Sequence, residues 1–172
     1  MDTLFAKLSS KYKQRLITQF YLSDNVRFRR IETEGDPEIS RCFTFKKEIA
    51  GKVLEIERQV SHYDYILAQT VAVSELHKVR FKVPGAEPDT HWDIDFLVEE
   101  QGGPIYFALA ECEFPENANY EILSDLEGHI ALVVPPHSAR FFSNSRLTDQ
   151  EYARNVLQDY LGVHHALSTS TA

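Results

Sequence analysis

Along most of the chain, apolar and polar residues alternate with a period of two, which is the spacing of side chains on one face of a β-strand. Residues with turn chemistry separate the alternating stretches. Ala50 and Gly51 leave so short a connection that the strands on either side should form a hairpin. The pattern predicts strands over residues 15–21, 25–32, 41–49, 52–60, 78–83, 92–99 and 105–114.

Three other stretches follow the helical repeat. Ser61 and Asp64 have the spacing of a capping box, and so have Thr148 and Glu151. The pattern predicts helices over residues 61–76, 117–127 and 148–161. A chain rich in strands with a few helices indicates an α+β fold in which about three helices lie at the periphery of the sheet.

Composition limits the class of protein further. With 172 residues, 43% of them hydrophobic, we expect a single globular domain over residues 1–163 and a disordered polar tail over residues 164–172. The net charge of −8 argues against duplex DNA as a partner. Two cysteines do not make a disulfide framework, and the chain has neither a membrane-length apolar run nor the apolar region of a signal peptide. We therefore expect a cytoplasmic protein without a membrane partner.

The polar positions of the predicted strands carry the functional information. Each of six strands has ionic side chains, mostly of one sign, on one face and apolar residues on the other. An ordinary sheet with one solvated face is the alternative explanation, but such a face usually mixes uncharged polar residues with unpaired charges. The bases are Arg27, Arg29, Lys46, Lys78, Arg80 and Lys82, and the acids are Glu55, Glu57, Asp93, Asp95, Glu111 and Glu113.

If the helices cover the apolar face and the sheet closes, these charges line an interior. A barrel of about eight strands can enclose a small ligand, so we expect an antiparallel eight-stranded β-barrel. Enclosed charges are costly without partners, which indicates an occupant. Arginine and lysine bind phosphate oxygens, and paired carboxylates suit Mg²⁺ or Mn²⁺. The predicted occupant is therefore a polyphosphate with a divalent metal ion.

The order of these charged pairs resembles that of the CYTH superfamily, also called the triphosphate tunnel metalloenzymes. Each pair is a weak signal alone, whereas eight elements in order are specific, and together they cover about residues 3–160. The elements are Ile-Thr-Gln-Phe-Tyr-Leu at 17–22, Arg27-x-Arg29, Thr44-x-Lys46, Glu55-x-Glu57, Lys78-x-Arg80, Trp-Asp-x-Asp-Phe at 92–96, Ala-Glu-x-Glu at 110–113 and a Ser-Asn element within 140–147.

The resemblance implies a tunnel of eight strands that binds a triphosphate together with Mg²⁺ or Mn²⁺. Most members hydrolyse tripolyphosphate, thiamine triphosphate or the 5′-triphosphate of RNA, and a smaller branch cyclises ATP. Carried over by position, phosphate contacts fall to Arg27, Arg29, Lys46, Lys78 and Arg80, catalytic roles to Lys78, Arg80, Glu111 and Glu113, and metal binding to Glu111, Glu113, Asp95, Asp93, Glu55 and Glu57.

One element of the family pattern is changed here. The hallmark Glu-x-Glu-x-Lys has its nearest match in Thr-Leu-Phe-Ala-Lys at residues 3–7, which keeps Lys7 but neither carboxylate. The leading interpretation is metal-dependent hydrolysis of tripolyphosphate, thiamine triphosphate or a nucleoside or RNA 5′-triphosphate. The alternatives are a module that binds or sequesters a nucleotide or triphosphate without turnover, which the missing glutamates favour, and an adenylate cyclase of the CYTH type.

Overall fold

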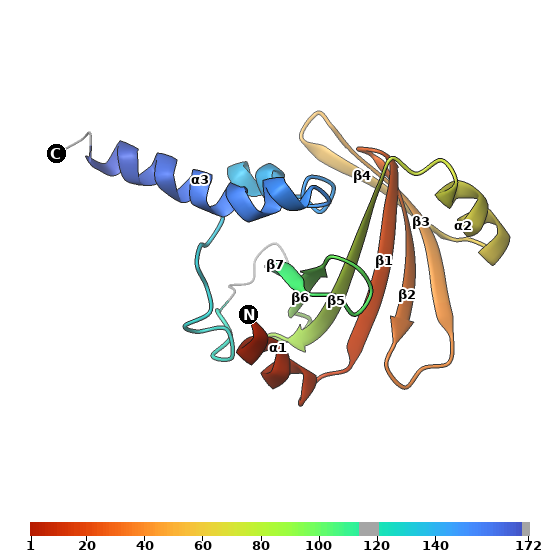
Figure 1. The fold of residues 1–172 in the computed structure, drawn as a ribbon, viewed down its shortest axis with the longest axis horizontal. Helices are drawn as coiled ribbons and strands as arrows, with labels where there is room; N and C mark the ends of the chain where they lie inside the picture. Colours follow the sequence, from red (N-terminus) through yellow and green to blue (C-terminus); the bar gives the residue numbers. More distant parts are fainter. Residues whose placement is uncertain (114–120, 170–172) are drawn as a thin grey trace.

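The computed structural model describes the backbone of residues 1–113 and 121–169, and the side chains of residues 1–112 and 121–160. One antiparallel sheet with four helices around it makes up this α+β fold (Figure 1). The strands are β1 (Gln14–Ser23), β2 (Val26–Thr33), β3 (Ile39–Ile49), β4 (Lys52–Gln59), β5 (Ser74–Pro84), β6 (His91–Val98) and β7 (Ile105–Glu113). The helices are α1 (Asp2–Ser9), α2 (His62–Gln69), the 3₁₀ helix η1 (Pro136–Phe142) and α3 (Gln150–Thr169).

The strands lie in the order β4-β3-β2-β1-β5-β6-β7, and every neighbouring pair is antiparallel. All seven predicted strands are present, although β5 begins at Ser74 rather than Lys78. The sheet curves, with α3 on its inner side and α2 on the other (Figure 1). The alternating pattern of the sequence therefore predicted the strands well.

The predicted eight-stranded barrel is met only in part, because the sheet has seven strands and does not close within the described residues. Residues 3–7, the segment matched to the family hallmark, lie in α1 and not in an eighth strand. Leu4 and Leu8 stand one helical turn apart, and both are buried in one cluster with Val79 and Phe81. That spacing gives a helix one continuous apolar stripe, which explains why the segment is helical.

The apolar side of the sheet is covered by both N-terminal helices. Tyr65 of α2 packs edge-on against Phe20 with 5.0 Å between ring centroids, and Phe20 stacks on Phe28 at 5.4 Å. The α1 residue Phe5 contacts Phe81 in the same edge-on manner at 5.5 Å. Because these rings take the apolar side of the strands, the ionic side chains are directed to the other side.

Helix α2 is shorter than the predicted helix. The Ser61 hydroxyl accepts a capping hydrogen bond as expected, but the helix ends at Gln69. Val73 lies within the predicted range 61–76, yet the residue is 72% exposed. Its backbone N–H donates to the carbonyl of Tyr21 in β1 at 2.8 Å, so pairing with the sheet replaces the last turn of the helix.

The helix predicted over residues 117–127 is not found in the part that can be compared. Residues 117–120 lie outside the described residues, and residues 121–127 form an extended stretch and turns. Leu126 is buried, and Leu123 packs beside it against the cluster that includes α1. The apolar residues of this segment therefore anchor a loop against the sheet and do not form the face of a helix.

The third predicted helix is present as α3. The Asp149 carboxylate, rather than Thr148, caps it by accepting a hydrogen bond from the backbone N–H of Tyr152 at 3.0 Å. The helix runs to Thr169, so that its last turns fall within the range expected to be a disordered tail. None of the helices that the structure describes is both long and apolar enough to cross a membrane.

We predict that Leu8→Ala lowers the free energy of unfolding by about 2–5 kcal/mol, because Leu8 is completely buried and its truncation leaves a cavity. Tyr63→Ala is the matched control in α2, since Tyr63 is 74% exposed, and should change stability by less than about 0.5 kcal/mol. Urea denaturation measures both. Equal effects for the two variants would contradict the described packing of α1.

Candidate functional site

The strand register brings ionic side chains from all seven strands to one surface of the sheet, which we call the polar face. Residues directly opposite each other on paired strands share a face. Arg80 lies opposite Asp95, for example, and Lys46 lies opposite Glu55. The described ionic residues of the polar face include the predicted ones, which are Arg27, Arg29, Lys46, Glu55, Glu57, Lys78, Arg80, Lys82, Asp93, Asp95 and Glu111, and in addition Arg15 and Glu48.

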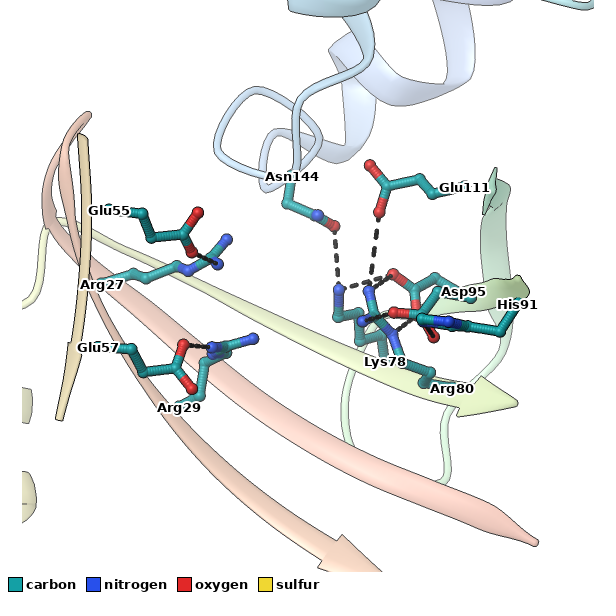
Figure 2. Close-up of polar contacts among 11 residues, drawn as sticks. Arg27, Arg29, Glu55, Glu57, Lys78, Arg80, His91, Asp95, Glu111 and Asn144 are labelled. Atoms are coloured by element: carbon teal, nitrogen blue, oxygen red, sulfur yellow. Dashed lines mark hydrogen bonds and ion pairs between the residues drawn. The ribbon is translucent and has the colours of Figure 1, made fainter. Parts of the chain in front are cut away.

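Half of the polar face is a buried ion cluster formed by Lys78, Arg80, Asp93 and Asp95 (Figure 2). The Asp95 carboxylate accepts hydrogen bonds from Lys78 Nζ at 2.7 Å and from Arg80 Nε and Nη2, both at 2.6 Å. Arg80 also pairs with Asp93, and Lys78 Nζ donates to Asn144 Oδ1 at 3.4 Å. The side chains of Lys78 and Asp95 are only 3% and 1% exposed, so this cluster is shielded from water.

Two opposing effects act on the pKa of the Asp95 carboxyl. Burial alone would raise it, because a charged carboxylate is poorly solvated inside the protein. The positive charge of Lys78 and the hydrogen bonds from Arg80 outweigh burial, so the pKa lies below its ordinary value of 3.8. Asp95 is therefore ionised wherever the protein is folded near neutral pH.

The other half of the polar face carries the edge ion pairs, which join β2 and β3 to the outermost strand β4. Glu55 lies 3.2 Å from Lys46 Nζ. It also lies 3.8 Å from Arg27 Nη2, and Glu57 pairs with Arg29 (Figure 2). The two glutamates are 39% and 48% exposed, in contrast to the buried ion cluster. These pairs stand in contact with water.

A cavity of about 230 Å³ lies on the polar face beneath the C-terminal segment. Its lining combines the cations Arg27 and Lys46 with the carboxylates of Asp24 and Glu111 and with residues 143–145, which follow η1. Tyr21 also lines it, and burial raises the pKa of its phenol to about 12, so the hydroxyl stays protonated. The cavity thus offers cations, hydroxyl groups and an amide to a bound anion.

The carboxylates predicted to hold Mg²⁺ or Mn²⁺ do not fit a metal site as they lie. No group of three acidic, histidine or cysteine ligands gathers among the described side chains. Asp95 is engaged by two cations, Glu55 and Glu57 lie across the sheet on β4, and Glu111 lies 3.8 Å from the Arg80 guanidinium. A divalent cation needs several free oxygen ligands around one point. The side chain of Glu113 lies outside the described part.

Several polar residues of this face were absent from the predicted set, and two of them are buried side by side. Gln19 and Tyr21 lie opposite Arg29 and Arg27 in the neighbouring strand, and Gln19 donates a hydrogen bond to the Tyr21 hydroxyl. Both are buried, at 1% and 5% exposure. The alternation in the sequence could have identified these two residues, because Gln19 and Tyr21 stand two residues apart in β1, on the face that carries the arginines of β2. A buried amide at such a position indicates a polar environment.

Comparison with known proteins identifies no relative: no family model, no curated protein and no solved structure matches this chain. The resemblance to the CYTH superfamily rests on the motifs quoted for it.

We predict that Asp95→Asn destabilises the protein by about 3–5 kcal/mol, because it leaves Lys78 buried without a countercharge and removes the carboxylate that accepts two hydrogen bonds from Arg80. Glu57→Gln removes a carboxylate that is 48% exposed and should cost less than about 1 kcal/mol. Chemical denaturation of both variants at neutral pH measures the difference. A small loss for Asp95→Asn would show that the buried ion cluster contributes little.

Acid should weaken the folded state partly through Asp95. Because the pKa of this carboxyl is lowered on folding, its contribution to stability is complete above the unfolded value of 3.8 and is lost as the pH falls through the lower, folded value. We expect the free energy of unfolding of the wild type to fall more steeply below about pH 4 than that of Asp95→Asn. Parallel acid titrations followed by circular dichroism test this, and parallel curves would contradict it.

Proposed function

We propose that the polar face binds a triphosphate, either inorganic tripolyphosphate or the phosphate chain of a nucleotide. The observation that carries this proposal is the cavity in which Arg27 and Lys46, from adjacent strands, face residues 143–145. Guanidinium and ammonium groups are the usual protein partners of phosphate oxygens, and hydroxyl and amide groups complete their coordination. The resemblance to the CYTH superfamily supports the same class of ligand.

The size of the cavity favours a small, highly charged ligand. At about 230 Å³ it is smaller than the roughly 300–1,000 Å³ of pockets that enclose drug-sized molecules. Arg29 lies two residues beyond Arg27 on β2, so the cations are spread along the sheet and suit a chain of charges better than a single one. A phosphate chain would lie in the cavity, and the remainder of a nucleotide would extend from it.

Binding without turnover is the activity that the geometry supports best. The carboxylates of the polar face are engaged by cations, and the segment that matches the hallmark of the family forms α1 on the apolar side. Metal-dependent hydrolysis is the second candidate, and Glu111 favours it, because this carboxylate is 53% exposed and lines the same cavity as Arg27. Cyclisation of ATP, RNA 5′-triphosphate ends as ligands, complete closure into an eight-stranded tunnel and a cytoplasmic location stay predictions.

We predict that tripolyphosphate and ATP bind in the presence of EDTA, and that Arg27→Ala and Lys46→Ala each weaken binding about 10- to 100-fold. Each substitution removes charged hydrogen bonds worth roughly 1.5–3 kcal/mol. Lys47→Ala is the matched control, because Lys47 follows Lys46 in β3 and faces the other side of the sheet. Isothermal titration calorimetry measures the affinities, and thermal melting checks that the variants fold.

The same titrations separate the two candidate functions. Binding in EDTA without phosphate release after Mg²⁺ or Mn²⁺ is added supports the binding module. Metal-dependent release that Glu111→Gln abolishes supports hydrolysis instead. If neither tripolyphosphate nor ATP binds under any of these conditions, the proposed function is wrong.

A further inference from the structure

The edge ion pairs occupy the groups that the proposed ligand needs. One carboxylate oxygen of Glu55 lies 3.8 Å from Arg27 Nη2 (Figure 2). The other lies 3.2 Å from Lys46 Nζ. Glu57 pairs with Arg29 and also accepts a hydrogen bond from Thr44 Oγ1 at 3.1 Å. Two carboxylates therefore hold the cations where phosphate oxygens would bind.

The arginines have donors to spare in this arrangement. The Nε atoms of Arg27 and Arg29 are buried, and neither makes a hydrogen bond to any residue that the structure describes. The two arginine side chains are 22% and 15% exposed, whereas Glu55 and Glu57 are 39% and 48% exposed. The two arginines are thus largely buried against the sheet, whereas the two glutamates are more exposed. The glutamates leave the Nε donors of both arginines without a hydrogen bond within the described part of the chain.

Because β4 is an exposed edge strand, the side chains of Glu55 and Glu57 can separate from their cations at low cost. Strand β4 is the outermost strand, pairs with β3 alone among the described elements, and is exposed along its whole length. Ion pairs in contact with water contribute little, roughly 0.2–1 kcal/mol each, whereas breaking a buried pair costs about 3–5 kcal/mol. A polyanion can therefore displace Glu55 and Glu57 from their cations but not Asp95 from the buried ion cluster.

We infer that Glu55 and Glu57 are built-in counter-ions that occupy the anion-binding groups of the free protein and compete with the triphosphate for them. This inference rests on the proposed function and adds residues that set its affinity. The inferred effect of these glutamates on ligand affinity is opposite to the effect that the family resemblance implies. A metal-binding glutamate strengthens the binding of a metal–triphosphate complex, whereas a competing glutamate weakens the binding of the free anion.

The test is calorimetric titration of the full chain with inorganic tripolyphosphate in EDTA. We expect Glu55→Gln and Glu57→Gln each to tighten binding roughly fivefold, the change that corresponds to about 1 kcal/mol of charge interaction near water. The double variant should bind more tightly than either single variant. Glutamine keeps the size of the side chain, and substitution on an exposed strand is tolerated, which thermal melting verifies.

Glu38→Gln is the control for a general change in net charge. It removes the same single negative charge from an exposed position in the β2–β3 connection, at the end of β2 remote from Arg27. It should leave the affinity within about twofold of the wild-type value, because exposed charges farther apart than the Debye length are largely screened.

Each outcome decides between the proposals. If the wild type binds and Arg27→Ala weakens binding, but the glutamine variants bind equally or less tightly, the counter-ion inference is wrong and the proposed function stands. If only the double glutamine variant binds, the two glutamates compete for the cations as inferred, but the proposed function fails for the wild-type protein. If no form binds tripolyphosphate, the inference is wrong, and if no form binds ATP either, the proposed function fails with it.

Discussion

The fold depends on a register between neighbouring strands that places the phenylalanine rings of β1, β2, β5 and β6 on one side of the sheet and the buried ion cluster on the other. A slip of one residue between β5 and β6 would turn Asp95 to the apolar side and leave Lys78 and Arg80 buried without their countercharge. The aromatic packing opposes the same slip from the other side, because it would direct Phe96 into the ionic surface. Ion pairing and aromatic packing thus specify one arrangement together.

Much of this arrangement could be predicted from the alternation in the sequence, because side-chain direction in a strand depends on residue number alone. The secondary structure of short apolar segments could not. Leu4 and Leu8 fit a strand edge or a helix equally well until their contacts are known, and Val73 became part of a sheet connection. The separation of the charges into two groups was hidden as well, because it depends on β1 lying between β2 and β5, which no local pattern encodes.

Burial divides residues that motif spacing had treated as equals. Lys78 and Arg80 were expected to bind phosphate and take part in catalysis, yet both are committed to Asp95 inside the protein. Arg27 and Lys46 carry the same charges, but they pair with the solvent-exposed Glu55. Both also line the cavity. Lys78 and Arg80 on β5 thus stabilise the sheet, whereas Arg27 on β2 and Lys46 on β3 can exchange Glu55 for a ligand. Stability and ligand binding therefore depend on different strands.

The exposed position of β4 has a consequence for association. On its outer side this strand pairs with no other strand in the described chain, and it presents free backbone donors and acceptors to solvent. Such an edge can recruit a strand from another molecule and begin aggregation. Lys52, Glu55, Glu57 and Arg58 place charges of both signs along this exposed strand. Charged side chains on an edge strand are one of the features by which natural sheets resist pairing with another molecule.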